Sequence, residues 1–176
     1  MDSTKDAKRL KSELRKRYRA EREFLVVECN WEHLIQSSEV LQATVVASYI
    51  SYGLEPDTSA LNSALLKVGK TVLIPRMLAD KDLEWVRWNG DDADGEVFTD
   101  EIDVVIAPAL HIDREGNRLG QGGGSYDRAL ARTSAWKVAL VYPGELSSEA
   151  IPSEPHDQKV DAAATAENLV RFTERN

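Results

Sequence analysis

A glycine-rich segment with flanking arginines carries the clearest chemical signal in this chain of 176 residues. The segment reads GNRLGQGGGSYDR at residues 116–128, and its loop glycines are Gly120, Gly122, Gly123 and Gly124. Because glycine has no Cβ atom, the N–H groups of such a loop can converge on an anion, and Arg118 and Arg128 add positive charge beside it. The pattern matches neither G-x-x-x-x-G-K-[ST] nor G-x-G-x-x-G. It predicts a phosphate-binding loop of another kind, the alternative being a tight connection between a strand and a helix.

A second source of positive charge is the N-terminal segment, where nine basic and three acidic residues lie between positions 5 and 22. An apolar stripe at helical spacing runs through it, formed by Leu10, Leu14, Tyr18 and Leu25. Lys11 and Arg15 lie four residues apart, so they share one helix face beside this stripe. With the stripe docked on the protein, both cations would reach the glycine loop, the alternative being a solvated basic face. The remaining arginines are expected on such a solvated face: Arg17, Arg19 and Arg22.

The elements that position these groups follow from apolar patterning. Four short runs rich in β-branched residues predict strands, at 44–51, 70–77, 103–110 and 137–143. Helical patterns separate them at 58–69 and at 125–135, the latter with Ser125 as its candidate N-cap. This alternation predicts a single α/β domain over residues 1–176, with an open, mostly parallel sheet, helices on both faces and a basic N-terminal helix. A further helix at 31–42 and an edge strand at 160–165 are also expected.

The topology brings the candidate ligand-binding groups to one edge of this sheet. Glu55 follows the first predicted strand, and the glycine loop follows the third. Open α/β sheets bind ligands at the carboxyl ends of their strands, so both groups are expected to contact a ligand. For Glu55 the alternative is a surface carboxylate before Pro56, and for Tyr126 it is packing beneath the following helix.

Composition excludes several classes of protein. Apolar residues make up 42% of the chain and charged residues 30%, which excludes a disordered tail and a fibrous repeat. No apolar run approaches the ~18 residues of a membrane span, and the first ten residues are too charged for a signal peptide. The single cysteine, Cys29, excludes an internal disulfide and favours a cytoplasmic location. The net charge of −8 disfavours nucleic acid as a partner over most of the surface.

Five ordered motifs resemble those of the 5-formyltetrahydrofolate cyclo-ligase, or methenyltetrahydrofolate synthetase, family. The glycine segment 118–128 is similar to the family signature Arg-Leu-Gly-x-Gly-Gly-Gly-x-Tyr-Asp-Arg. The other similar segments are KSELRKRYRAER at 11–22, YISYGLEPDTSAL at 49–61, GKTVLIPR at 69–76 and PHDQKVDAAAT at 155–165.

The resemblance implies an ATP-dependent C–N bond-forming ligase that uses Mg²⁺ to close 5-formyltetrahydrofolate to 5,10-methenyltetrahydrofolate, releasing ADP and phosphate. The implied ATP-binding residues are Lys11, Arg15, Arg118, Leu119, Gly120, Gln121, Gly122, Gly123, Gly124, Ser125 and Tyr126. The implied folate-binding residues are Ile50, Glu55, Gln121, Gly122, Ser125 and Tyr126, with Glu55 on the pterin. Asp127 and Asp157 are the implied magnesium ligands, an oxygen-only pair that suits this ion, although Asp127 could instead cap its helix. The implied partners are ATP and a reduced folate, without nucleic acid or membrane, and the protein is expected to be a monomer.

The chain departs from the family pattern near the folate. Ser125 stands where the family commonly has the first tyrosine of Tyr-Tyr-Asp, and a short acidic connection at 88–101 replaces a longer stretch that helps to enclose the folate. Trp85 and Trp88 could replace the missing aromatic groups, or could belong to the core. One alternative is therefore a non-catalytic nucleotide-binding relative that has lost part of the folate site. Another is an RNA-binding protein that uses the basic arm, which the net charge and the lack of interleaved exposed aromatic residues disfavour.

Overall fold

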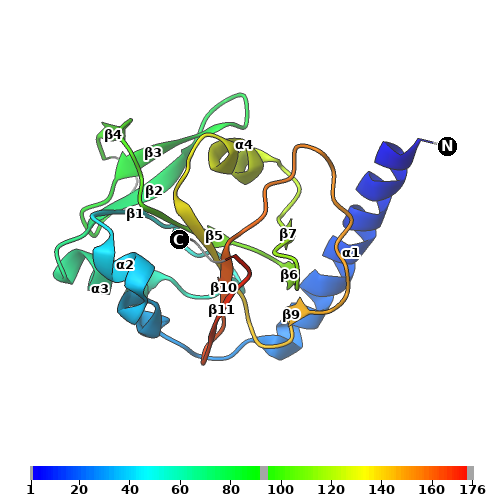
Figure 1. The fold of residues 1–176 in the computed structure, drawn as a ribbon, viewed down its shortest axis with the longest axis horizontal. Coiled ribbons are helices and arrows are strands. Elements are labelled where there is room, and N and C mark those ends of the chain that lie inside the picture. The colour runs from blue at the N-terminus through cyan, green and yellow to red at the C-terminus, as the bar shows by residue number, and fades with distance from the viewer. Residues whose placement is uncertain (1, 92–94, 174–176) are drawn as a thin grey trace.

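An eight-stranded sheet forms the centre of the protein, seen in a computed structural model that describes residues 2–91 and 95–173 (Figure 1). Its strand order is β11-β10-β8-β5-β1-β2-β3-β4. The central strands β10, β8, β5, β1 and β2 are parallel, and β11, β3 and β4 add antiparallel edges. In chain order the strands are β1 (Val45–Ala47), β2 (Thr71–Met77), β3 (Leu83–Arg87), β4 (Val97–Phe98), β5 (Val104–Pro108), β8 (Trp136–Leu140), β10 (Ala162–Ala164) and β11 (Leu169–Arg171). The predicted α/β architecture with a mostly parallel sheet is confirmed.

The central strands are apolar throughout because successive side chains enter two different cores. On one face, Val46 and Ile106 pack with residues of η1 (Glu32–Gln36) and α3 (Ser59–Lys67). On the other face, Ala47 and Val105 pack with residues of α4 (Ser125–Ala131). Helical elements therefore cover both faces, as the sequence predicts, with α2 (Ser38–Gln42) beside η1.

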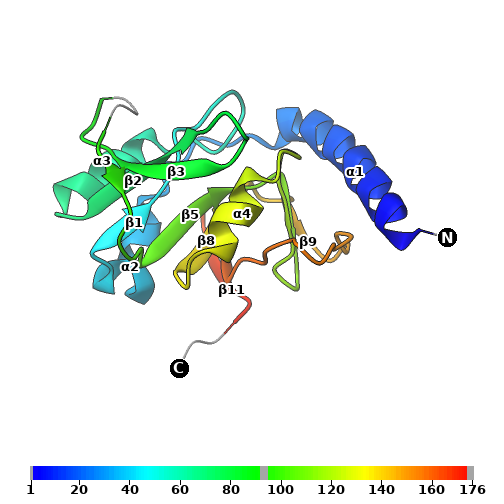
Figure 2. The same ribbon diagram turned by 90° about the horizontal axis from the view of Figure 1, so that it is seen from above.

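Helix α1 (Ser3–Leu25) lies at the far end of the molecule from α2 and α3, in both views (Figures 1 and 2). It packs on a second sheet made of β6 (His111–Asp113), β7 (Arg118–Leu119) and β9 (Leu146–Ser147). Tyr18 of α1 stacks on His111 with ring centroids 4.0 Å apart. Although α1 has 23 residues it is highly charged, and no helix within residues 2–91 and 95–173 is both long and apolar enough to cross a bilayer.

The buried face of α1 differs from the predicted stripe. Leu10 is 41% exposed, whereas Lys11, Tyr18 and Arg22 are buried. Arg22 was expected in solvent, but its guanidinium forms a buried ion pair with Glu145. Leu14, Tyr18 and Leu25 of the predicted stripe do pack against the protein. The stripe was incomplete because it counted apolar side chains only, whereas buried carboxylates make two cations part of the interface.

Other boundaries also differ from the sequence predictions. Residues 31–42 form the 3₁₀ helix η1 and the short helix α2 rather than one helix, because Ser37 ends the first and caps the second, its side chain accepting a hydrogen bond from the N–H of Val40. The strand at 160–165 is not an edge, since β11 pairs with β10 beyond it. Helix α4 begins after Gly124, whose left-handed backbone supplies the N-cap position that the sequence assigned to Ser125. The first strand ends at Ala47, so residues 48–58 form the connection to α3.

Candidate active site

A cavity of about 770 Å³ lies between α1 and the loops at one end of the sheet. This volume falls within the range of sites that bind small molecules. Basic side chains from α1 line one side, the glycine loop lines another, and the segment 154–158 contributes a third. The cavity thus gathers groups from the first residues of the chain and from its last quarter.

The glycine loop bends sharply between β7 and α4. Gly122 has φ +109° and Gly124 has φ +75°, both in the region that residues with a Cβ atom rarely adopt. The loop leads directly into the N-terminus of α4, where N–H groups lack partners within the helix. These two glycines therefore allow the backbone to line the cavity at a position that is electrostatically favourable for an anion.

Arg118 forms the floor beneath this loop. Its side chain is 4% exposed, its Nη1 donates to the Pro108 carbonyl at 3.0 Å, and its Nη2 lies 3.5 Å from a carboxylate oxygen of Asp127. Its guanidinium also lies 5.6 Å from the ring centroid of Tyr126. A Cβ atom added at Gly120 would lie 2.8 Å from Nη1 of Arg118, so an alanine there would force the guanidinium or the loop to shift.

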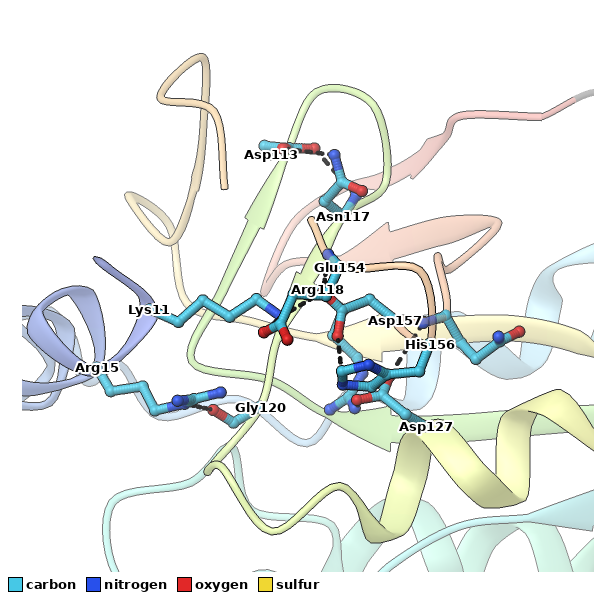
Figure 3. A network of polar contacts seen from close by, with 11 residues as sticks. Lys11, Arg15, Asp113, Asn117, Arg118, Gly120, Asp127, Glu154, His156 and Asp157 are labelled. Atoms are coloured by element: carbon cyan, nitrogen blue, oxygen red, sulfur yellow. Dashed lines mark hydrogen bonds and ion pairs between the residues drawn. The ribbon is translucent and has the colours of Figure 1, made fainter. Parts of the chain in front are cut away.

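Of the two cations predicted to reach over the loop from α1, Arg15 contacts the loop, whereas Lys11 points to the segment 154–157 (Figure 3). Nε of Arg15 donates to the Gly120 carbonyl at 2.8 Å, and burial, followed by the nearby charge of Arg19, lowers the pKa of Arg15 from its usual value. Lys11 is buried, and its ammonium group lies 2.9 Å from a carboxylate oxygen of Glu154 and in contact with Asp157. Docking of α1 therefore rests on polar contacts to the same segments that line the cavity.

Three potential metal ligands lie together across from Lys11. One ligand atom from each of Glu154, His156 and Asp157 lies within 4.8 Å of the others. Asp127 is not a member of this group, but it lines the same cavity, and its Oδ1 accepts a hydrogen bond of 3.0 Å from the N–H of Gln158. The carboxylates fit the oxygen-donor preference of Mg²⁺, and Lys11 holds two of them in the ligand-free protein.

Glu55 and Tyr126 line the cavity apart from these carboxylates. Burial raises the pKa of Glu55, although the N–H of Tyr52 donates to its carboxylate at 2.8 Å. Burial also raises the pKa of Tyr126, and its hydroxyl is buried without a hydrogen-bond partner among the described residues. Glu55 thus offers a hydrogen-bond acceptor to a ligand in the cavity, whereas the Tyr126 hydroxyl is enclosed by the protein.

Every residue assigned from the sequence lines this cavity except Ile50. Ile50 is 52% exposed and lies outside the lining. The Ser125 hydroxyl does not cap helix α4. It donates a hydrogen bond to the carbonyl of Lys81, in the turn between β2 and β3. Trp85 and Trp88 are both buried in the cores, and Trp85 makes an edge contact with Tyr126 at 6.3 Å between ring centroids.

Sequence reasoning missed Glu154 and its contact with Lys11. Nothing in the motif pattern distinguishes Glu154 from the other acidic residues of this acidic chain. The position of Lys11 beside the apolar stripe could have indicated this contact, because a lysine that is buried when its helix docks needs a carboxylate partner. The acidic residues close to Asp157 in sequence, Glu154 among them, were the candidates for this partner.

Comparison with known proteins gives a consistent result. A family model described as the 5-formyltetrahydrofolate cyclo-ligase family matches residues 3–166. The 5-formyltetrahydrofolate cyclo-ligase of Mycolicibacterium smegmatis is 35% identical over 138 residues, covering 66% of this chain and 71% of the relative. The mouse protein of the same name is 27% identical over 157 residues, covering 74% of this chain and 77% of its own.

Two solved structures share the fold. The Aquifex aeolicus 5,10-methenyltetrahydrofolate synthetase superposes with a TM-score of 0.76 at 27% identity, with 95% of each chain covered. The 5,10-methenyltetrahydrofolate synthetase from Mycoplasma pneumoniae gives a TM-score of 0.67 at 17% identity, covering 98% of this chain and 100% of the other. The latter likeness concerns the fold alone.

Proposed function

Because this chain belongs to the 5-formyltetrahydrofolate cyclo-ligase family, we propose that it catalyses the ATP- and Mg²⁺-dependent closure of 5-formyltetrahydrofolate to 5,10-methenyltetrahydrofolate. ADP and phosphate are the other products. The observation that carries the proposal is the convergence of Lys11, Arg15 and Arg118 with the glycine loop in one cavity that Glu55 also lines. A polyphosphate and a hydrogen-bonding heterocycle would each find complementary groups there.

The reaction we propose has two chemical steps. The formyl oxygen on N5 attacks the γ-phosphorus of ATP, and the bond from that phosphorus to ADP breaks, giving a phosphorylated imidate. N10 then attacks the activated formyl carbon and loses its proton, and the C–O bond breaks to release phosphate. Phosphoryl transfer of this kind depends on positioning and on neutralisation of charge, so it requires no nucleophile from the protein.

The chain's own groups supply that positioning. The N–H groups of the glycine loop and the cations of Arg15 and Arg118 would hold the phosphates in line with the formyl oxygen. Asp127 and Asp157 would hold Mg²⁺, which supplies positive charge alongside the phosphates when it is bound. Lys11 would then exchange its contacts with Glu154 and Asp157 for contacts with phosphate oxygens.

Glu55 would orient the folate. Its carboxylate would accept hydrogen bonds from the donor-rich edge of the pterin, and Tyr126 lines the same cavity.

The proposed function is tested with the purified protein, 5-formyltetrahydrofolate and Mg-ATP, by following the absorbance of 5,10-methenyltetrahydrofolate. We expect product formation that requires both ATP and Mg²⁺. Omission of ATP, and separately chelation of the metal, serve as controls. ATP binding without any turnover would refute the proposal and identify a nucleotide-binding relative instead.

A further inference from the structure

A continuous path of contacts, buried except at its last step, connects helix α1 to the loop that carries Glu55. The path begins at Arg22, which is 4% exposed. Its Nε and Nη2 donate to the two carboxylate oxygens of Glu145 at 2.7 and 2.9 Å, and Nη2 also donates to the Ala109 carbonyl at 2.6 Å. A buried arginine is stable only when its donors are satisfied in this way, so Arg22 has one well-defined position.

Tyr142 is the next group on the path. The carboxylate of Glu145 accepts the N–H of Tyr142 at 2.9 Å, and the Arg22 guanidinium lies 5.5 Å from the centroid of the Tyr142 ring. The backbone and the ring of Tyr142 are therefore both held by the ion pair. Burial raises the pKa of Tyr142, which keeps its hydroxyl protonated and able to donate.

The hydroxyl of Tyr142 donates to the carbonyl of Leu54 at 2.8 Å. Leu54 directly precedes Glu55, in the irregular connection between β1 and α3. The other side-chain hydrogen bonds of residues 49–59 join this segment to itself or to Asn62. Among the described residues, the hydrogen bond from Tyr142 is the one that reaches the segment from a distant part of the chain.

We propose that Tyr142 is a positioning residue for Glu55, and that the Arg22–Glu145 pair holds Tyr142 in place. This proposal rests on the function proposed above. Tyr142 does not line the cavity that contains the glycine loop, although it lines a second, smaller cavity with Leu54 and Glu55. Its hydrogen bond to the Leu54 carbonyl is what connects it to the backbone that carries Glu55. Because α1 also carries Lys11 and Arg15, one helix supports both the phosphate side and the folate side of the site.

The test is the substitution Tyr142→Phe, which removes one hydroxyl and keeps the ring. Loss of a single neutral hydrogen bond at the loop should raise KM for 5-formyltetrahydrofolate, and the Kd measured by calorimetry, by about five- to tenfold. KM for ATP should stay within about twofold. Tyr18→Phe is the matched control, because it also removes a buried tyrosine's hydroxyl, and that hydroxyl bonds to Glu149, which takes no part in the path. It should leave folate affinity unchanged.

A double-mutant cycle shows whether Tyr142 acts through Glu55. In the Glu55→Gln background, Tyr142→Phe should add less than twofold to the folate KM, since the contact it positions is already weakened. Three results would each overturn the proposal. They are full additivity of the Tyr142→Phe and Glu55→Gln effects on the folate KM, an unchanged folate KM in Tyr142→Phe, and an equal rise of the KM values for folate and for ATP. A wild-type protein without cyclo-ligase turnover would refute the proposed function itself, which separates the two failures.

Discussion

Gly120 offers a quantitative test of the contact between the glycine loop and Arg118. A Cβ atom at this position would lie 2.8 Å from Nη1, 3.2 Å from Nη2 and 3.3 Å from Cζ of Arg118. Arg118 cannot move aside without breaking its bond to the Pro108 carbonyl and its contact with Asp127. A hydrogen bond from a charged group contributes about 1.5–3 kcal/mol, so Gly120→Ala should lower the free energy of unfolding by about that amount.

Gly123 is the matched control for this substitution. The nearest atom to a Cβ placed there is Oγ of Ser125 at 3.8 Å, which is ordinary van der Waals contact. In the ligand-free protein, Gly123→Ala should therefore change the free energy of unfolding by no more than about 0.5 kcal/mol.

Thermal and urea denaturation of the two ligand-free variants would measure the difference. For a chain of this length, Gly120→Ala should lower Tm by roughly 3–12 °C, and ATP should bind at least about tenfold more weakly, because Arg118 is displaced. Equal Tm values for the two variants would show that Arg118 yields freely to a methyl group. The packing of the glycine loop on Arg118 would then not determine the shape of the loop.

Four further outcomes are expected. Lys11→Ala should raise KM for ATP more than KM for folate, and equal effects on both would contradict its placement near the phosphates. Asp127→Ala should abolish Mg²⁺-dependent turnover and lower Tm no more than Gly120→Ala does, as measured by a Mg²⁺ titration beside a melting curve. Glu55→Gln should impair folate use selectively, so a defect confined to ATP would contradict the proposed pterin contact. Burial lowers the pKa of His111 to about 4, so as the pH falls the imidazole is protonated in the unfolded chain before it is protonated in the folded protein. The contribution of His111 to stability should therefore be complete above pH 6.5 and should decrease as the pH drops toward 4. His111→Phe should reduce this pH dependence of Tm in melting curves.

Local patterning was sufficient to predict the order of the main elements. The four β-branched runs all became central strands, because a strand or a glycine run before a helix depends on neighbours in sequence. The glycine loop and Glu55 line one cavity with Asp127 and Asp157, a pair that was assigned from the family resemblance. The short hairpin strand β3 and the second sheet carried weaker signals and were not predicted.

The failures involve partners that are distant in sequence. Leu10 fitted an apolar stripe, yet it is exposed, while Lys11 and Arg22 are buried. Their burial depends on Glu154 and Glu145, which lie more than a hundred residues further along the chain. Helical periodicity ranks side chains by apolarity alone, so it cannot show that a carboxylate elsewhere makes a cation part of the interface.

The contacts of α1 have a consequence for synthesis of the protein on the ribosome. This helix precedes by more than a hundred residues the groups that it docks against, Glu145, Glu149 and Glu154. Its cationic side chains therefore stay in solvent until the segment 145–154 has left the ribosome. The cavity that α1 lines cannot form before that segment is available.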